Sequence, residues 1–290
     1  MYISNFMISM GNDEEQSLST QPHRRSVSVR VVGFVGGWIF KKLHGIGSAV
    51  TFVYSILSLI FRRPFQFNLL VRQLLLVGVN SLPVVLVSGI FTGMVLATQG
   101  YHQLKDLSAE GSVGRFVSVS VVKELGPMVT AFILAGRIGA SITAELGTMK
   151  VTEQIDALEV MATSPIKYLV VPRFVACAIM LPLLTTFSIV FGIAGGYFTS
   201  VYILPFKMNG RFFLEQARTY IFISSVVVSL IKSSTFGMAI ASVGCYKGFT
   251  ISSAGGAEGV GKATTGSAVT SLIAILILDF VLNHVLYTIW

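Results

Sequence analysis

Five stretches of the chain are apolar over more residues than a helix in a soluble core requires. A helix rises about 1.5 Å per residue, so each stretch can cross a hydrocarbon layer of about 30 Å. Because lipid offers no partner to an open sheet edge, we expect an all-α membrane protein with about five transmembrane helices. Pro182 and Gly192 predict a kink or a break in the third. The segments are Leu74–Thr98, Phe116–Ala144, Tyr168–Tyr202, Ile221–Cys245 and Ala268–Ile289.

The composition supports a membrane protein. Hydrophobic residues make up 53% of the 290 positions and charged residues 12%, and that charged share is about half the usual soluble one. The net charge of +8 does not indicate nucleic-acid binding, because the basic residues do not cluster on a soluble face. Cys177 and Cys245 both lie in apolar runs, which is typical of small buried hydrophobes rather than of a disulfide or a metal pair.

The residues before the first strong segment divide into two parts. Residues 1–30 are polar, with acids at 13–15 and arginines at 24, 25 and 30, and we expect a disordered cytoplasmic tail. Residues 31–62 mix apolar and basic positions, which favours a helix lying in the membrane interface over a poorly spanning first helix. Residues 68–290 are then the transmembrane bundle of a single domain over 31–290.

Lysine and arginine residues set the expected orientation. With a cytoplasmic N-terminus, thirteen of them fall on the cytoplasmic side and five on the other, which puts the C-terminus outside. The thirteen are Arg24, Arg25, Arg30, Lys41, Lys42, Arg62, Arg63, Arg72, Lys150, Lys167, Arg173, Lys247 and Lys262. The five are Lys105, Arg115, Lys207, Arg211 and Arg218.

Pairs of small residues spaced four apart recur within the apolar segments. Such spacing lets helix backbones approach closely in lipid, within one chain or across a dimer. The pairs are Gly33/Gly37, Gly89/Gly93, Ala135/Gly139 and Gly192/Gly196.

Ionisable residues lie inside the predicted spans. Placing a charge at the bilayer centre costs at least about 2.5–3.5 kcal/mol on insertion scales, so such residues need a partner or a wet cavity. Glu124 and Lys232 have opposite charge and lie mid-segment in different helices, which predicts an interior ion pair. Its role is either purely architectural or mechanistic, and both hypotheses stay open. The in-span charges are Lys123, Glu124, Lys232 and Asp279.

The loop between the second and third segments predicts a short helix. Thr152 begins it and Pro165 ends it, and an apolar stripe at helical spacing predicts packing on one side. The helix either lies flat on the membrane surface or docks a soluble partner. The acidic residues favour docking, because anionic lipid repels them. The acids are Glu153, Asp156 and Glu159, and the stripe is Ile155, Leu158 and Met161–Ala162.

Two sites are excluded. Residues 256–263 nearly match a phosphate-binding loop, but Ala263 stands where the magnesium-binding hydroxyl belongs and no strand precedes it, so no ATP site is expected in this chain. No metal site is expected either, because the histidines form no ligand set. The histidines are His23, His44, His102 and His284.

The chain resembles the MlaE-type permeases across about residues 65–285. Charged and glycine positions agree in order over that length. The matching motifs are Gln99–Tyr101, Lys123–Pro127, Ala135–Gly147, Glu153–Gln154, Ala157–Met161, Pro165, Val171–Phe174, Lys232–Ser233 and Leu278–Leu282.

The resemblance implies the permease subunit of an ABC transporter that moves glycerophospholipids between the inner membrane and a partner membrane. It implies a homodimer with the lipid pocket at the dimer interface, near the outer leaflet. The helix around Glu153–Ser164 would be the coupling helix on the ATPase. The implied lipid-binding residues are Leu96, Gln99, Tyr101, Leu104 and Leu107. The implied coupling residues are Glu153, Gln154, Asp156, Leu158, Glu159 and Met161.

The implied partners are a second copy of the chain, a cytoplasmic ABC ATPase dimer that binds the ATP, a periplasmic MCE-domain lipid-binding protein and phospholipid. The chain itself would carry no cofactor and catalyse no reaction. The absence of a transit peptide favours a bacterial inner membrane over a plastid envelope. The alternatives are a secondary transporter driven by an ion gradient through Glu124 and Asp279, and an intramembrane enzyme; no catalytic motif supports the enzyme.

Overall fold

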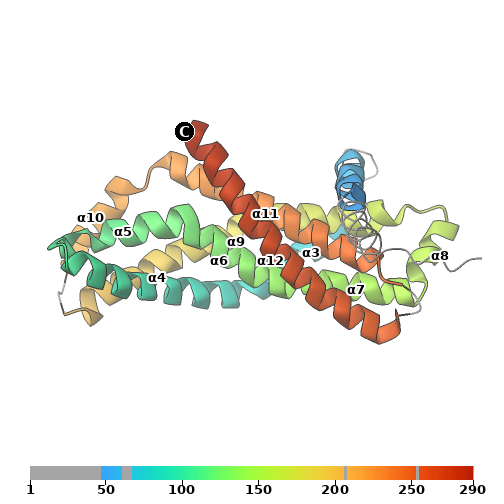
Figure 1. The fold of residues 1–290 in the computed structure, drawn as a ribbon, viewed down its shortest axis with the longest axis horizontal. Coiled ribbons are helices and arrows are strands. Elements are labelled where there is room, and N and C mark those ends of the chain that lie inside the picture. Colours follow the sequence, from blue (N-terminus) through green and yellow to red (C-terminus); the bar gives the residue numbers. More distant parts are fainter. Residues whose placement is uncertain (1–46, 61–66, 206–207, 253–254, 290) are drawn as a thin grey trace, which may run out of the picture. The chain divides into compact units, whose positions relative to one another are not determined.

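The computed structural model describes residues 47–60, 67–205, 208–252 and 255–289, and every regular element within these ranges is a helix (Figure 1). Five helical stretches there are long and apolar enough to cross a membrane. The prediction of an all-α membrane protein with five spans is therefore confirmed. The five stretches are Phe67–Lys105, Glu110–Val151, Ile166–Ile203, Ile223–Phe249 and Gly256–Leu286.

The first two spans are each assembled from several helical pieces. π-helical turns are rare and often lie at functional sites, and the second span contains two of them, η3 and η4. The first span is α3 (Phe67–Val77), η1 (Val79–Ser81) and α4 (Leu82–Lys105). The second is η2 (Glu110–Ser112), α5 (Val113–Ser120), η3 (Val121–Leu125), α6 (Gly126–Leu134), η4 (Ala135–Gly139) and α7 (Ala140–Val151).

The third span shows how a proline is accommodated inside a helix. It consists of η5 (Ile166–Val170), α9 (Val171–Phe198) and η6 (Thr199–Ile203), and α9 runs through Pro182 without interruption. Of the two predicted alternatives the break is therefore wrong, and the kink stays a prediction. Pro182 has no N–H for the Ala178 carbonyl one turn earlier, but the Ser234 hydroxyl donates to that oxygen at 3.0 Å. The neighbouring helix replaces the lost bond.

The last two spans are single helices, α11 (Ile223–Phe249) and α12 (Gly256–Ile289). Two short helices lie outside the spans, α8 (Gln154–Val160) and α10 (Gly210–Tyr220). In Figure 1, α8 lies beyond α7 at one end of the bundle, whereas α5 and α10 lie at the other end. The two ends therefore differ in their accessory helices.

The start of α8 differs from the prediction. Thr152 does not cap it, because its hydroxyl donates to the Thr148 carbonyl at 2.8 Å and so belongs to the end of α7. Glu153 follows with a φ of 60°, in the left-handed region. That reversal separates α7 from α8, and the acidic residue precedes the helix without a side-chain capping bond.

The N-terminal predictions are only partly described. An apolar helix spans Gly47–Ile60, and in its later part Ile56 is fully buried while the Phe52 ring lies 5.8 Å from Tyr246. Its location in the membrane interface stays a prediction. Residues 1–46, which include the tail and Gly33/Gly37, lie outside the described residues.

Glycines allow α4 and α9 to pack backbone to backbone. A Cβ on Gly93 would overlap the Gly192 carbonyl, and a Cβ on Gly195 would overlap the Ile90 carbonyl. Neither obstacle is a flexible side chain, so the helices would have to separate. The small-residue pairs Gly89/Gly93 and Gly192/Gly196 thus lie in an interface within one chain.

We predict that Gly93→Ala lowers the free energy of unfolding by about 1–3 kcal/mol, because overpacking displaces backbone. Thermal unfolding of the purified protein in detergent measures the change. Gly136→Ala is the matched control, since a Cβ there meets nothing within 4 Å. Equal midpoints for the two variants would contradict the close α4–α9 contact.

Candidate functional site

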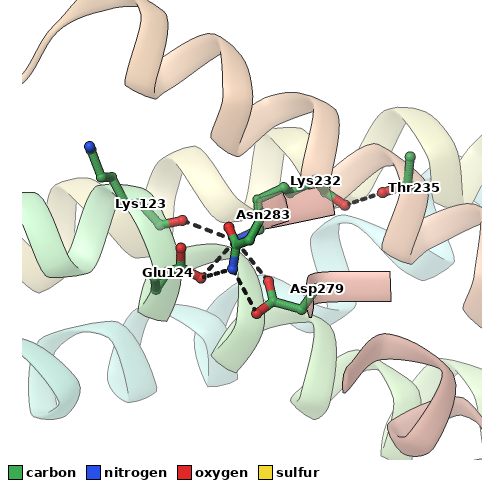
Figure 2. Close-up of polar contacts among 6 residues, drawn as sticks. All are labelled: Lys123, Glu124, Lys232, Thr235, Asp279 and Asn283. Carbon is green, nitrogen blue, oxygen red and sulfur yellow. Dashed lines mark hydrogen bonds and ion pairs between the residues drawn. The ribbon is translucent and has the colours of Figure 1, made fainter. Parts of the chain in front are cut away.

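A buried lysine joins three spans through two carboxylates. Lys232 on α11 has no exposed side-chain surface, and its Nζ lies 2.7 Å from Glu124 Oε2 and 2.7 Å from Asp279 Oδ1. Glu124 belongs to η3 and Asp279 to α12, so the second, fourth and fifth spans meet here (Figure 2). The structure contains the predicted Glu124–Lys232 contact and adds Asp279 to it.

Asn283 completes the cluster. Its side-chain oxygen accepts from Lys232 Nζ at 3.0 Å, and its amide donates to Glu124 at 3.2 Å and to Asp279 at 3.4 Å. Sequence reasoning missed this residue. The available signal was its spacing of four from Asp279, which places two polar side chains on one face of an apolar helix.

The backbone at Lys123 supplies a further contact, and the reason lies in Pro127. In an α-helix the Lys123 carbonyl would accept from the N–H of residue 127, but proline has none. That carbonyl instead accepts from Lys232 Nζ at 3.3 Å. Figure 2 shows the Lys123 ammonium pointing away from the cluster, so Lys123 contributes its oxygen there and not its charge.

The cluster pairs one ammonium with two carboxylates in a poorly solvated place. Taking such charges out of water costs several kcal/mol per ion, which the mutual attraction offsets only if the hydrogen bonds are well formed. Lys232 meets four oxygen atoms within 3.3 Å. The arrangement can therefore fix the relative positions of three spans. Removing one member leaves the remaining groups without a charge or hydrogen-bond partner.

A cavity of about 430 Å³ lies near the α5–α10 end of the bundle. Its lining is mostly apolar but includes the cations Arg115 and Lys123. The Arg115 guanidinium lies 4.1 Å from the centre of the Tyr220 ring, a favourable cation–π distance. The cavity thus combines apolar walls with positive charge, as an anionic amphiphile requires.

The predicted lipid-binding residues are distributed around this region. Leu104 lines the cavity. Leu96 is half-buried in the neighbouring apolar cluster and Tyr101 is buried there, whereas Gln99 and Leu107 are exposed. The structure does not bring the five residues together in one cavity of the single chain.

Helix α8 is seated on the bundle by one face. Ile155 is buried and Leu158 is partly buried against the main apolar core. Val160 and Met161 at its end are 89% and 66% exposed. Asp156 pairs with Lys150 at 2.6 Å, while Glu153, Gln154 and Glu159 are exposed. Ile155 and Leu158 therefore hold α8 against the bundle, and the exposed side chains face away from it.

Comparison with known proteins identifies the chain. Residues 70–285 match the family of permease MlaE. The chain belongs to the MlaE permease family. A probable ABC transporter permease protein of Rickettsia typhi is 40% identical over 259 residues, covering 89% of this chain and 98% of the relative. A probable ABC transporter permease protein of Synechocystis is 41% identical over 216 residues, covering 74% and 81%.

A further relative is named more specifically. The intermembrane phospholipid transport system permease protein MlaE of Haemophilus influenzae is 38% identical over 224 residues, covering 77% of this chain and 84% of the relative. The MlaE-family chain is thus a multi-pass, non-catalytic permease subunit of an ABC transporter, a class that works with an ATPase partner. The gradient-driven and enzymatic alternatives do not fit this membership.

The near-match to a phosphate-binding loop is explained by helix formation. Residues 256–263 form the first turns of α12, and Lys262 pairs with Glu258 one turn earlier at 2.6 Å. Within the described residues no group of three or more His, Cys, Asp or Glu side chains is placed to hold a metal.

We predict that Lys232→Met destabilises the protein by about 3–5 kcal/mol, because Glu124 and Asp279 lose the counter-charge that the fully buried Lys232 supplies. The triple variant Lys232→Met/Glu124→Gln/Asp279→Asn removes all three charges and recovers most of that loss. Thermal unfolding in detergent measures both. A single variant as stable as the wild type would show that the cluster does not hold the spans together.

Proposed function

We propose that this chain is the permease of an ATP-driven transporter that moves glycerophospholipids between the bacterial inner membrane and a partner outer membrane. The observation that carries the proposal is the membership in the MlaE family together with the similarity to a relative named for intermembrane phospholipid transport. ATP hydrolysis belongs to a separate cytoplasmic ATPase dimer. Extraction of lipid needs such an energy source, because each buried CH₂ contributes about 0.8 kcal/mol.

The cavity near the α5–α10 end supports a lipid substrate. Apolar walls suit acyl chains, and Arg115 and Lys123 suit a phosphate. A single chain provides about 430 Å³ there, which is less than a whole diacyl lipid needs. We therefore propose that a second copy of the chain completes the pocket at a homodimer interface, with the residues predicted from the resemblance at its border.

α12 supports the proposed dimer. It is the least buried of the five spans: 11% of its most apolar stretch is buried inside the chain, against 28–50% for the other spans. Four of its exposed apolar residues recur at helical spacing along one face. These four are Val269, Ile273, Ile277 and Phe280. Such a face suits either lipid or a second copy, and a second copy also places the Lys232 clusters of the two chains near one interface.

The two ends of the bundle suit different partners. We propose that α8 faces the cytoplasm as the coupling helix and contacts the ATPase. This orientation agrees with the excess of lysine and arginine in the tail and loops on the α8 side of the membrane. The end with α5 and α10 then faces the periplasm and an MCE-domain lipid-binding protein. The N-terminus is cytoplasmic in this arrangement.

Co-purification tests the proposal. The tagged chain is isolated from its native cells in mild detergent, and mass spectrometry identifies the proteins and lipids that accompany it. We expect an ABC ATPase, an MCE-domain protein and bound phospholipid. Recovery of a homo-oligomer without any ATPase would overturn the proposal.

The coupling role of α8 gives a sharper prediction. Val160→Asp and Met161→Asp each weaken ATPase binding at least about tenfold, because a charge replaces an apolar contact at the interface. Both side chains are exposed, so the permease itself remains folded. Leu214→Asp on α10, which likewise replaces an exposed apolar side chain by a charge, is the control and leaves ATPase binding unchanged. Equal binding by all three variants would remove α8 from the ATPase interface.

A further inference from the structure

One buried guanidinium has an unused donor. Arg173 on α9 is 3% exposed. Its Nη1 donates to the Leu169 carbonyl at 2.7 Å and its Nη2 lies 2.8 Å from Glu145 Oε1 on α7. Its Nε is buried and has no acceptor among the described residues. Buried donors in native proteins nearly always have a partner, so this atom indicates an acceptor that binds there.

Arg173 lines a cavity of about 220 Å³ between α3, α7, η5 and α9. Arg72, Gln73 and Tyr168 line it as well, together with Glu145. Two guanidinium groups thus face one carboxylate, which leaves a formal charge of +1. Arg72 makes no side-chain hydrogen bond or ion pair within the described part of the chain. Planar, always charged arginines with free donors suit a phosphate.

The position of the cavity favours a lipid headgroup over a dissolved anion. α3 carries the exposed apolar side chains Val71 and Leu75, and Val79 on η1 continues them, so acyl chains have an apolar surface to follow. The volume suits a headgroup but not a whole diacyl lipid. α7 leads from here directly into α8, so the cavity lies at the coupling-helix end of the bundle and not at the α5–α10 end.

We infer that this cavity is a second lipid site, in which Arg72 and Arg173 bind the phosphate of an anionic phospholipid from the leaflet on the α8 side. The Arg173–Glu145 pair connects α9, which follows α8 and η5 in the chain, to α7, which precedes α8. A bound headgroup would therefore stabilise the contact between α7 and α9, next to α8. The site is separate from the proposed transport pocket and holds whether or not that pocket is correct.

Site-specific photo-crosslinking tests the site. The purified full-length chain carries Leu69→benzoylphenylalanine, because Leu69 lines the cavity, and is placed in phosphatidylcholine vesicles doped with phosphatidylglycerol. Neither ATPase nor nucleotide is present. After illumination, mass spectrometry identifies the lipid attached at position 69. We expect phosphatidylglycerol to be captured well above its share of the bilayer.

Arginine variants localise the recognition. Arg72→Gln lowers the capture of phosphatidylglycerol about tenfold, as loss of one charged contact implies, while Arg72→Lys keeps most of it. Arg211→Gln, an exposed arginine on α10, is the control and changes nothing. Arg72 is itself exposed, so its replacement leaves the fold intact.

Three results would overturn the inference. Capture of phosphatidylcholine in proportion to its abundance would mean ordinary bilayer lipid around α3. Unchanged capture by Arg72→Gln would exclude headgroup recognition by that residue. Displacement of phosphatidylglycerol by inorganic phosphate at equal concentration would mean a site for a free anion. Because the assay involves no transport, its failure is distinguishable from failure of the proposed function.

Discussion

Two prolines free backbone carbonyls inside the bundle, and α11 supplies a donor to each. Pro127 cannot bond to the Lys123 carbonyl, which accepts from Lys232, and Pro182 cannot bond to the Ala178 carbonyl, which accepts from Ser234. In lipid an unpaired carbonyl costs several kcal/mol, so each contact holds a neighbouring span against α11. Lys232 also forms ion pairs with the carboxylates of Glu124 and Asp279. The arrangement of the second, third, fourth and fifth spans depends on this one helix.

That central position connects stability with function. Glu124 lies in η3, the same π-helical turn that carries Lys123 toward the larger cavity. The Lys232 cluster and that cavity therefore share one π-helical turn. At the opposite end, Ile155 on the buried face of α8 packs into the main apolar core, and the Arg173–Glu145 pair joins α9 to α7.

Much of this was predictable from the sequence, and the exceptions have physical causes. The length of an apolar segment is enough to predict a membrane-spanning helix, so all five spans were predicted. The Glu124–Lys232 contact followed from the cost of isolated charges in lipid. Asn283 was missed because its side chain is neutral, so the free energy of placing a charge in lipid does not single it out. The predicted break at Pro182 failed because its compensating donor, Ser234, lies 52 positions later in the chain, where no local pattern connects the two. The predicted helix start at Thr152 failed because Thr152 lies at the end of the preceding helix.

ATP-dependent lipid transfer is the most direct test of the central claim. The full chain is reconstituted with its ATPase in donor vesicles containing fluorescent phospholipid, and transfer to acceptor vesicles carrying the MCE-domain partner is followed with and without ATP. The account predicts transfer that requires ATP and continues when proton and sodium gradients are collapsed. Transfer that proceeds without ATP and stops when a gradient is collapsed would contradict it.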